Sequence, residues 1–132
     1  MSRGAVLLVE DSIDVRNVIS EIISGFGYSV SPAADGIDAW KMIRSDNFDL
    51  VITDIGLPNM AGDELIRKMR RNNINIPVIL IAGVDIKKGS AYCDRLINCR
   101  FVQKPFAIDE LRSSIVASLP AEIILTRNRK GQ

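Results

Sequence analysis

Residues 5–11 read Ala-Val-Leu-Leu-Val-Glu-Asp, an uninterrupted apolar run that ends in two acidic residues. Because polar residues do not alternate with the apolar ones, the run predicts a strand buried on both faces, as in a parallel sheet. A helical pattern follows, in which the apolar residues are Val15, Val18, Ile19, Ile22 and Ile23. Asp11 or Ser12 can cap the start of this helix. The stretch therefore predicts one strand–helix unit.

The same unit recurs along the chain. Further strands are expected at residues 28–31, 50–53, 78–82 and 100–102, and helical stripes at residues 37–43, 65–69, 87–97 and 108–119. Five strand–helix units in series predict an α/β domain whose parallel sheet is covered by helices on both faces. Right-handed crossovers leave few topologies for such a sheet.

Length and composition point to a single globular domain. The chain has 132 residues, 47% of them apolar and 25% charged, which is close to the globular average. We expect a single globular domain in residues 1–120 and a tail or cut linker in residues 121–132. A helix extension and a dimer contact are alternative interpretations of that last segment. A net charge of +1 predicts no direct binding of nucleic acid or membrane, and no apolar run is long enough for a bilayer span.

Two residue counts limit the chemistry. The chain contains no histidine, so it has no Ser-His-Asp or Cys-His machinery and no histidine-ligated zinc. A phosphohistidine that serves this chain must belong to a partner. The two cysteines, Cys93 and Cys99, make no disulfide framework, and we expect them as reduced thiols in a cytoplasmic protein.

Chemically useful residues follow the predicted strands. Glu10 and Asp11 follow the first strand, Asp54 the third and Lys104 the fifth. Because the carboxyl ends of parallel strands meet at one edge of the sheet, we expect these side chains to share a small space. Three crowded carboxylates and one lysine would suit Mg²⁺ and make a carboxylate a plausible phosphoryl acceptor.

Each residue alone has a simpler interpretation. Asp11 is more often a helix cap, Asp54 a solvated turn residue and Lys104 a surface lysine before a proline. Only their joint placement at the ends of three strands favours a functional site.

The motifs together resemble the receiver domain of two-component response regulators, including the single-domain chemotaxis type. The resemblance covers residues 5–119 and rests on five stretches: residues 6–11 (VLLVED), 34–39 (ADGIDA), 49–62 (DLVITDIGLPNMAG), 76–81 (IPVILI) and 101–106 (FVQKPF). It implies a flavodoxin-like fold with five helices and the strand order 2-1-3-4-5.

The resemblance also implies site roles. Asp54 would accept a phosphoryl group from a histidine kinase or a histidine phosphotransfer protein, and Lys104 would pair with a phosphate oxygen. The peptide before Pro105 would be cis, as is typical of the family. The Mg²⁺ ligands would be Glu10 (directly or through water), Asp11, Asp54 and the backbone carbonyl of Gly56.

One position departs from the family pattern. Ala82 stands where the family carries Thr or Ser at the end of the fourth strand, and the switch aromatic is Phe101, which also lacks a hydroxyl. Because a methyl group cannot donate a hydrogen bond, we expect phosphorylation to persist while its coupling to the output face is weakened or rerouted.

Other functions stay open at this point. A pseudo-receiver would bind a partner without phosphate, and Asp54→Asn would leave that binding unchanged. A haloacid-dehalogenase-like phosphohydrolase would need a second carboxylate where the chain has Gly56, and a flavodoxin would need a hydroxyl- and glycine-rich loop after the first strand. The chain has no P-loop motif. We expect a phosphorylatable switch that can dephosphorylate itself but turns over no external substrate. Its downstream partner is an unidentified protein, and a weak homodimer stays open.

Overall fold

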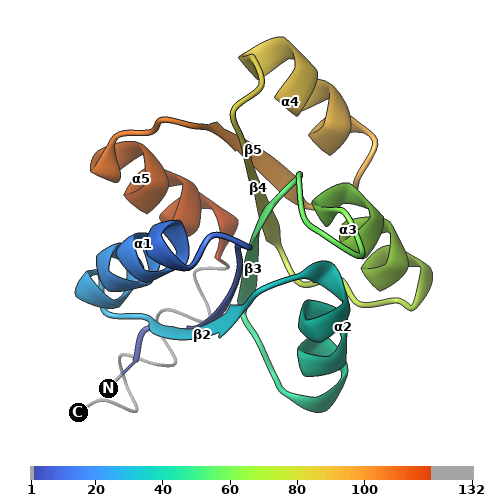
Figure 1. Ribbon diagram of the computed structural model, residues 1–132, viewed down its shortest axis with the longest axis horizontal. Coiled ribbons are helices and arrows are strands. Elements are labelled where there is room, and N and C mark those ends of the chain that lie inside the picture. Colours follow the sequence, from blue (N-terminus) through green and yellow to red (C-terminus); the bar gives the residue numbers. More distant parts are fainter. Residues whose placement is uncertain (1, 120–132) are drawn as a thin grey trace.

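A five-stranded parallel sheet in the order β2-β1-β3-β4-β5 forms the middle layer of the computed structural model, which describes residues 2–119 (Figure 1). The expected strand order and fold class are confirmed. The strands are β1 (Ala5–Val9), β2 (Ser29–Ala33), β3 (Leu50–Asp54), β4 (Val78–Ala82) and β5 (Cys99–Gln103). The helices are α1 (Ile13–Gly25), α2 (Gly36–Ser45), α3 (Gly62–Arg71), α4 (Ile86–Asp94) and α5 (Ile108–Ser118).

Helices cover both faces of the sheet. Figure 1 shows α1 and α5 on one face and α2, α3 and α4 on the other. Successive residues of the central strands therefore enter two different cores. Leu8 and Ile52 pack with the α1 and α5 side, whereas Leu7 and Val51 pack with the α2, α3 and α4 side. This double burial explains why the central strands read as continuous apolar runs.

Side chains at the helix starts act as caps. Ser12 rather than Asp11 caps α1, because its Oγ accepts a hydrogen bond from the Val15 N–H at 3.4 Å. Asp35 caps α2 through the Asp38 N–H at 2.8 Å. Among the strands, the expected boundaries shift most at β2, which begins after Tyr28 and continues to Ala33, because Pro32 is accepted at this edge strand.

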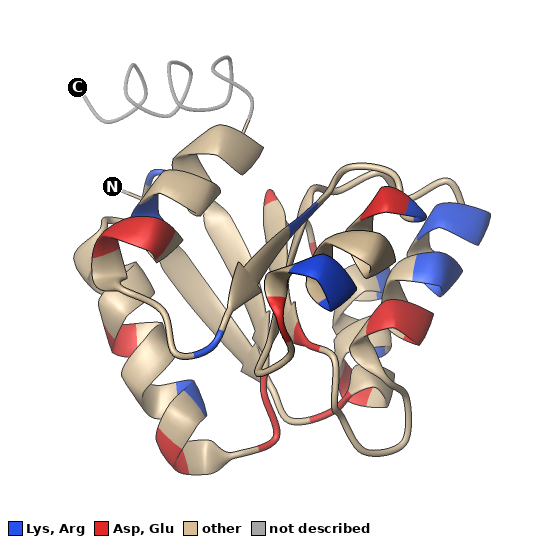
Figure 2. Cartoon of the chain, turned by 90° about the horizontal axis from the view of Figure 1, so that it is seen from above, with Lys and Arg blue, Asp and Glu red and all other residues tan. Residues whose placement is uncertain are grey.

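The apolar stripe of α1 is only partly buried. Ile19 and Ile23 enter the core, but Val15 and Val18 are 37% and 57% exposed. The sequence pattern placed all of these residues on one apolar face of the helix. In the structure, the edge of that face that carries Val15 and Val18 is exposed to solvent. Charged residues of both signs are spread over the helices (Figure 2). No helix within residues 2–119 is long and apolar enough to cross a bilayer.

The expectation of two reduced thiols is wrong for this structure. A disulfide joins Cys93 to Cys99, and their Cα atoms lie 5.0 Å apart. Sequence counting missed the pair because only the packing of α4 against β5 brings the two residues together. The predicted tail or linker, residues 121–132, lies outside the described residues.

Candidate functional site

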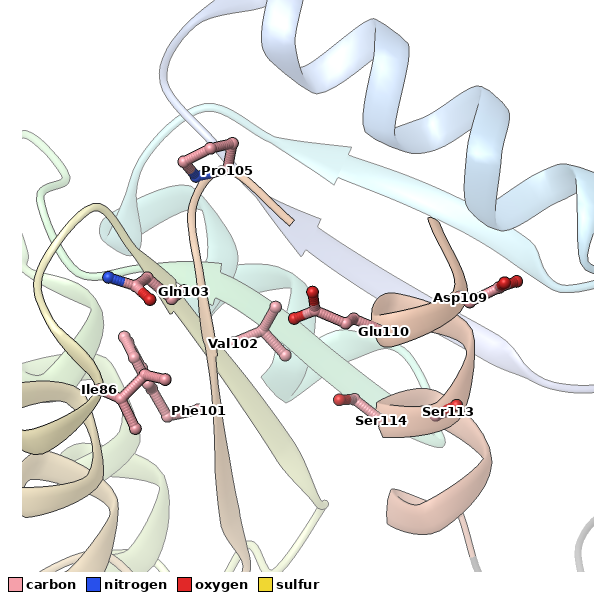
Figure 3. Close-up of a pocket in the computed structure, with 9 residues that line it drawn as sticks. All are labelled: Ile86, Phe101, Val102, Gln103, Pro105, Asp109, Glu110, Ser113 and Ser114. Carbon is pink, nitrogen blue, oxygen red and sulfur yellow. The ribbon is translucent and has the colours of Figure 1, made fainter. Parts of the chain in front are cut away.

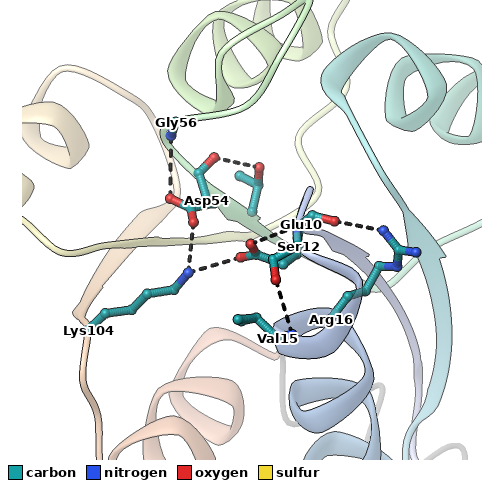
Figure 4. Close-up of polar contacts among 8 residues, drawn as sticks. Glu10, Ser12, Val15, Arg16, Asp54, Gly56 and Lys104 are labelled. Atoms are coloured by element: carbon teal, nitrogen blue, oxygen red, sulfur yellow. Dashed lines mark hydrogen bonds and ion pairs between the residues drawn. The ribbon is translucent and has the colours of Figure 1, made fainter.

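Lys104 brings together residues from three strand ends. Its Nζ atom donates hydrogen bonds to Glu10 Oε2 at 2.9 Å and to Asp54 Oδ2 at 2.7 Å (Figure 4). Lys104 is 94 residues from Glu10 and 50 residues from Asp54 along the chain. The sheet topology alone creates this cluster, as the carboxyl-end rule predicted.

Asp54 is held by its own backbone surroundings. It is the last residue of β3, and its carbonyl oxygen accepts a hydrogen bond from Thr53 Oγ1 at 2.9 Å. The Gly56 N–H donates to Asp54 Oδ1 at 3.3 Å, so both carboxylate oxygens have donors. Gly62 lies against the Asp54 carbonyl so closely that a methyl group there would overlap it.

Glu10 is the buried acid of the site, with only 3% of its surface exposed. Its Oε1 accepts a hydrogen bond from the Ser12 N–H at 3.3 Å, and its backbone carbonyl accepts one from Arg16 at 3.0 Å. Burial raises the pKa of the Glu10 carboxyl above its ordinary value, because the loss of water outweighs the hydrogen bond and charge of Lys104. The site thus carries an acid whose ionisation is costly.

Lys104 is fixed through both its backbone and its side chain. Burial opposes the charge on its ammonium, but the hydrogen bonds to Asp54 and Glu10 outweigh burial and raise the pKa of Lys104. Its backbone N–H donates to the Ala82 carbonyl at 2.8 Å. The Lys104–Pro105 peptide bond is cis, the isomer that the resemblance implies.

The acidic residues converge less tightly than the sequence suggested. Asp11 is exposed and lies beside Glu10 in the chain, whereas Glu10 and Asp54 meet directly through Lys104. Within residues 2–119, no group of three or more cysteine or acidic side chains is gathered as a set that could hold a metal ion. The structure therefore brings together Glu10, Asp54, Lys104 and the Gly56 backbone.

Of the two positions without a hydroxyl, only Ala82 is bonded directly to a site residue, Lys104. Ala82 ends β4 and is 4% exposed, and Gly83 follows it with open space where a side chain would stand. Phe101 lies in β5, and its ring packs on Gly89 of α4. A methyl group at Gly89 would overlap that ring.

An apolar groove of about 570 Å³ adjoins the site. Lys104, Pro105 and Phe106, which follow β5, line part of it. The remaining lining residues all come from α1: Asp14, Val15, Val18, Ile19 and Ile22. The exposed valines of α1 therefore belong to a surface that also includes Lys104.

Sequence reasoning missed three residues that shape the site. Thr53 and Gly62 hold the backbone of Asp54, and Gly89 makes room for Phe101. A glycine near the start of a predicted helix was a usable signal for Gly62. The contact of Gly89 with Phe101 depends on tertiary packing and had no signal in the sequence pattern.

Comparison with known proteins agrees with this geometry. The family model described as the response regulator receiver domain matches residues 6–116. The sporulation initiation phosphotransferase F of Bacillus subtilis is 30% identical over 123 residues, which cover 91% of this chain and 97% of that protein. The response regulator MprA of Mycobacterium avium is 32% identical over 86% of this chain, which spans only 50% of that protein's length.

A solved structure has the same fold. The receiver domain of the Francisella response regulator 1452 superposes with a TM-score of 0.79 at 27% identity, covering 95% of this chain and 98% of that one. The similarity thus extends over nearly all of both chains.

Proposed function

The chain belongs to the response regulator receiver domains of two-component systems, a family of signalling modules, and from that premise we propose that Asp54 accepts a phosphoryl group from a partner's phosphohistidine. The observation that carries the proposal is the bridge from Lys104 to Asp54 and Glu10. A cation held beside a carboxylate at the sheet edge is the arrangement that phosphoryl transfer needs. The donor histidine must come from a partner, since the chain has none.

The transfer requires little covalent chemistry from the protein. An Asp54 carboxylate oxygen attacks phosphorus, so that an O–P bond forms while the N–P bond breaks, and the histidine nitrogen keeps the electron pair. The Gly56 N–H and the Lys104 ammonium orient the carboxylate beforehand. On transfer, Lys104 exchanges an Asp54 oxygen for a phosphoryl oxygen and neutralises part of its charge.

A divalent cation fits the donor chemistry of the site. Carboxylate and carbonyl oxygens are the ligands that Mg²⁺ prefers, and the ion would offset the mutual repulsion of Glu10 and Asp54. The residues proposed to hold it are Glu10, Asp11, Asp54 and the Gly56 carbonyl. When bound, Mg²⁺ would neutralise charge on the transferred oxygens.

The groove beside Lys104 suits the phosphoryl donor protein. Its α1 wall exposes Val15 and Val18, and Lys104 of the proposed acceptor site also lines it. An apolar helical surface laid on these valines would bring its phosphohistidine to Asp54. We therefore propose a histidine kinase or histidine phosphotransfer protein as the partner, in the cytoplasm. Slow hydrolysis of the aspartyl phosphate would reset the domain.

Phosphorylation by a small donor tests the proposal. The chain is incubated with MgCl₂ and acetyl phosphate, and intact mass should show the addition of one phosphoryl group. Asp54→Ala should abolish the addition, whereas the exposed control Asp46→Asn should leave it unchanged. Lys104→Ala should slow it strongly. Equal labelling of Asp54→Ala and the original chain would overturn the assignment of the acceptor.

A phosphate-independent binding module is the second candidate. The absence of a hydroxyl at Ala82 favours it, because the usual hydrogen bond to the phosphoryl group cannot form there. The retention of Asp54, Glu10 and Lys104 in contact argues against it. Partner binding that is identical for the original chain and Asp54→Asn would select this function.

A further inference from the structure

A disulfide connects α4 to β5, the strand that contains the aromatic residue Phe101. Cys93 lies in the last turn of α4, and Cys99 is the first residue of β5. Their Cα atoms are 5.0 Å apart, within the separation of about 4.4–6.8 Å that disulfides span. The two backbones are therefore placed so that the bond can close with little movement of either one.

A second contact joins the same two elements. Gly89 lies one helical turn before Cys93, and Phe101 lies two residues after Cys99, so each pair shares a face of its element. The Phe101 ring packs directly on Gly89, where a methyl group would overlap it. Figure 3 shows Phe101 beside Ile86 of α4, while Val102 points towards α5. The position of α4 therefore determines whether the Phe101 ring is covered.

The β5 end of the disulfide is held independently of the sulfur bridge. The Val78 N–H donates to the Asn98 carbonyl at 3.0 Å, and Arg70 donates to the Ile97 carbonyl at 2.8 Å. Cys99 thus stays in place when the bridge opens. The element that can respond is α4, whose outer side leaves Ile86 63% exposed.

The position of the bridge favours a regulatory role over a structural one. The two cysteines are six residues apart in sequence, so the bridge closes a short loop and restricts the unfolded chain less than a long-range bridge would. In a reducing compartment such a bond is transient. We propose that Cys93 and Cys99 form a reversible redox site, which fixes α4 over Phe101 when oxidised and loosens α4 when reduced.

The oxidant of the proposed step is a low-molecular-weight disulfide. The Cys99 thiolate, which is half-buried, attacks one sulfur of that disulfide, forms a mixed disulfide and releases one thiolate. The Cys93 thiolate, which is 8% exposed, then attacks the Cys99 sulfur and releases the second thiolate. Two electrons pass from the cysteine pair to the reagent, and the two cysteine protons end on the released thiols.

Thiol labelling and hydrogen exchange on the whole chain test the proposal. The chain is fully reduced with dithiothreitol and then treated with oxidised glutathione, and remaining thiols are alkylated before intact mass is measured. The reduced form should take two alkyl groups and the oxidised form none. Amides of residues 86–94 should exchange several-fold faster in the reduced form, while those of β1 and β3 should not change.

Two serine variants serve as controls. Cys93→Ser should accumulate the glutathione mixed disulfide at Cys99. Cys99→Ser should form a mixed disulfide at the buried Cys93 far more slowly. Neither variant should show the oxidation-dependent change in α4. Asp54→Ala should keep the full response, because the redox site does not depend on phosphorylation. Failure to form the intramolecular bond, or equal exchange of α4 in both redox states of the original chain, would overturn the proposal.

Discussion

The backbone N–H of Lys104 donates to the carbonyl of Ala82 at 2.8 Å. Lys104, which would pair with a phosphoryl oxygen, is therefore bonded to Ala82, the residue that lacks the family's hydroxyl. The two strand ends remain coupled through their backbones even though the Ala82 side chain can only make apolar contacts. We therefore expect the acceptor site to stay intact while its usual link to Phe101 is weakened or rerouted.

Restoring the hydroxyl should restore that link. In Ala82→Thr, a side-chain O–H becomes available to a phosphoryl oxygen, whereas Ala82→Val supplies the same shape without it. We expect both variants to label at Asp54 at similar rates. Only the threonine variant should show a larger change in hydrogen exchange of β5 and α4 on binding beryllofluoride. Equal changes in the two variants would assign the effect to volume instead.

Neutralising Glu10 should stabilise the fold while weakening metal binding. Because burial raises the pKa of Glu10, stability falls as pH rises from the ordinary carboxyl value through the raised value. Glu10→Gln removes this loss and leaves Lys104 bonded to Asp54. We expect the free energy of unfolding at pH 7, measured in urea without metal, to rise.

The paired readout for Glu10→Gln is a calorimetric titration with MgCl₂. The variant should bind the ion more weakly than the original chain, because one anionic oxygen ligand is lost. Asp14→Asn, on the exposed start of α1, is the control and should change neither quantity much. A lower stability of Glu10→Gln would mean that its ion pair with Lys104 outweighs the cost of burial.

Arg70 of α3 should stabilise the fold by binding two loops, the one between α3 and β4 and the one between α4 and β5. Its guanidinium donates to the carbonyls of Ile74, Ile76, Ile97 and Asn98 at 2.7, 2.9, 2.8 and 3.3 Å. Arg70→Met leaves these carbonyls without that donor and should cost about 2 kcal/mol of unfolding free energy. The exposed neighbour Arg71→Met should cost far less. Similar losses in urea melts would contradict the role of Arg70.

Most of the fold could be predicted because its signals are local and periodic. The apolar runs of β1 and β4 were located residue by residue, since strands buried on both faces leave little polar interruption. The convergence of Glu10, Asp54 and Lys104 followed from one rule about parallel sheets. The meeting of these three side chains could therefore be predicted from the sequence.

The rest depends on contacts that no short pattern encodes. The exposure of Val15 follows from the way α1 packs on the sheet. The pairing of Cys93 with Cys99 follows from the packing of α4 against β5. Asp11 is acidic like Glu10 and follows it directly after β1, yet Asp11 is exposed whereas Glu10 is buried. The alternation of faces at the strand end separates these two neighbours, and only the structure resolves it.

The capping carboxylate of α2 should give the fold a measurable acid dependence. Asp35 Oδ1 accepts from the Asp38 N–H at 2.8 Å and Oδ2 from Asn59 Nδ2 at 3.0 Å. These hydrogen bonds, the first above all, lower the pKa of Asp35 in the folded state. The stabilisation is thus complete above the ordinary aspartate pKa of about 4 and is lost as pH falls through the lowered value.

Asp35→Asn keeps a capping oxygen but does not titrate. In thermal melts from pH 7 to pH 2, the difference between the original chain and Asp35→Asn should shrink below about pH 4. With Asp46→Asn as the control at the other end of α2, a difference that stays constant with pH would refute the assignment.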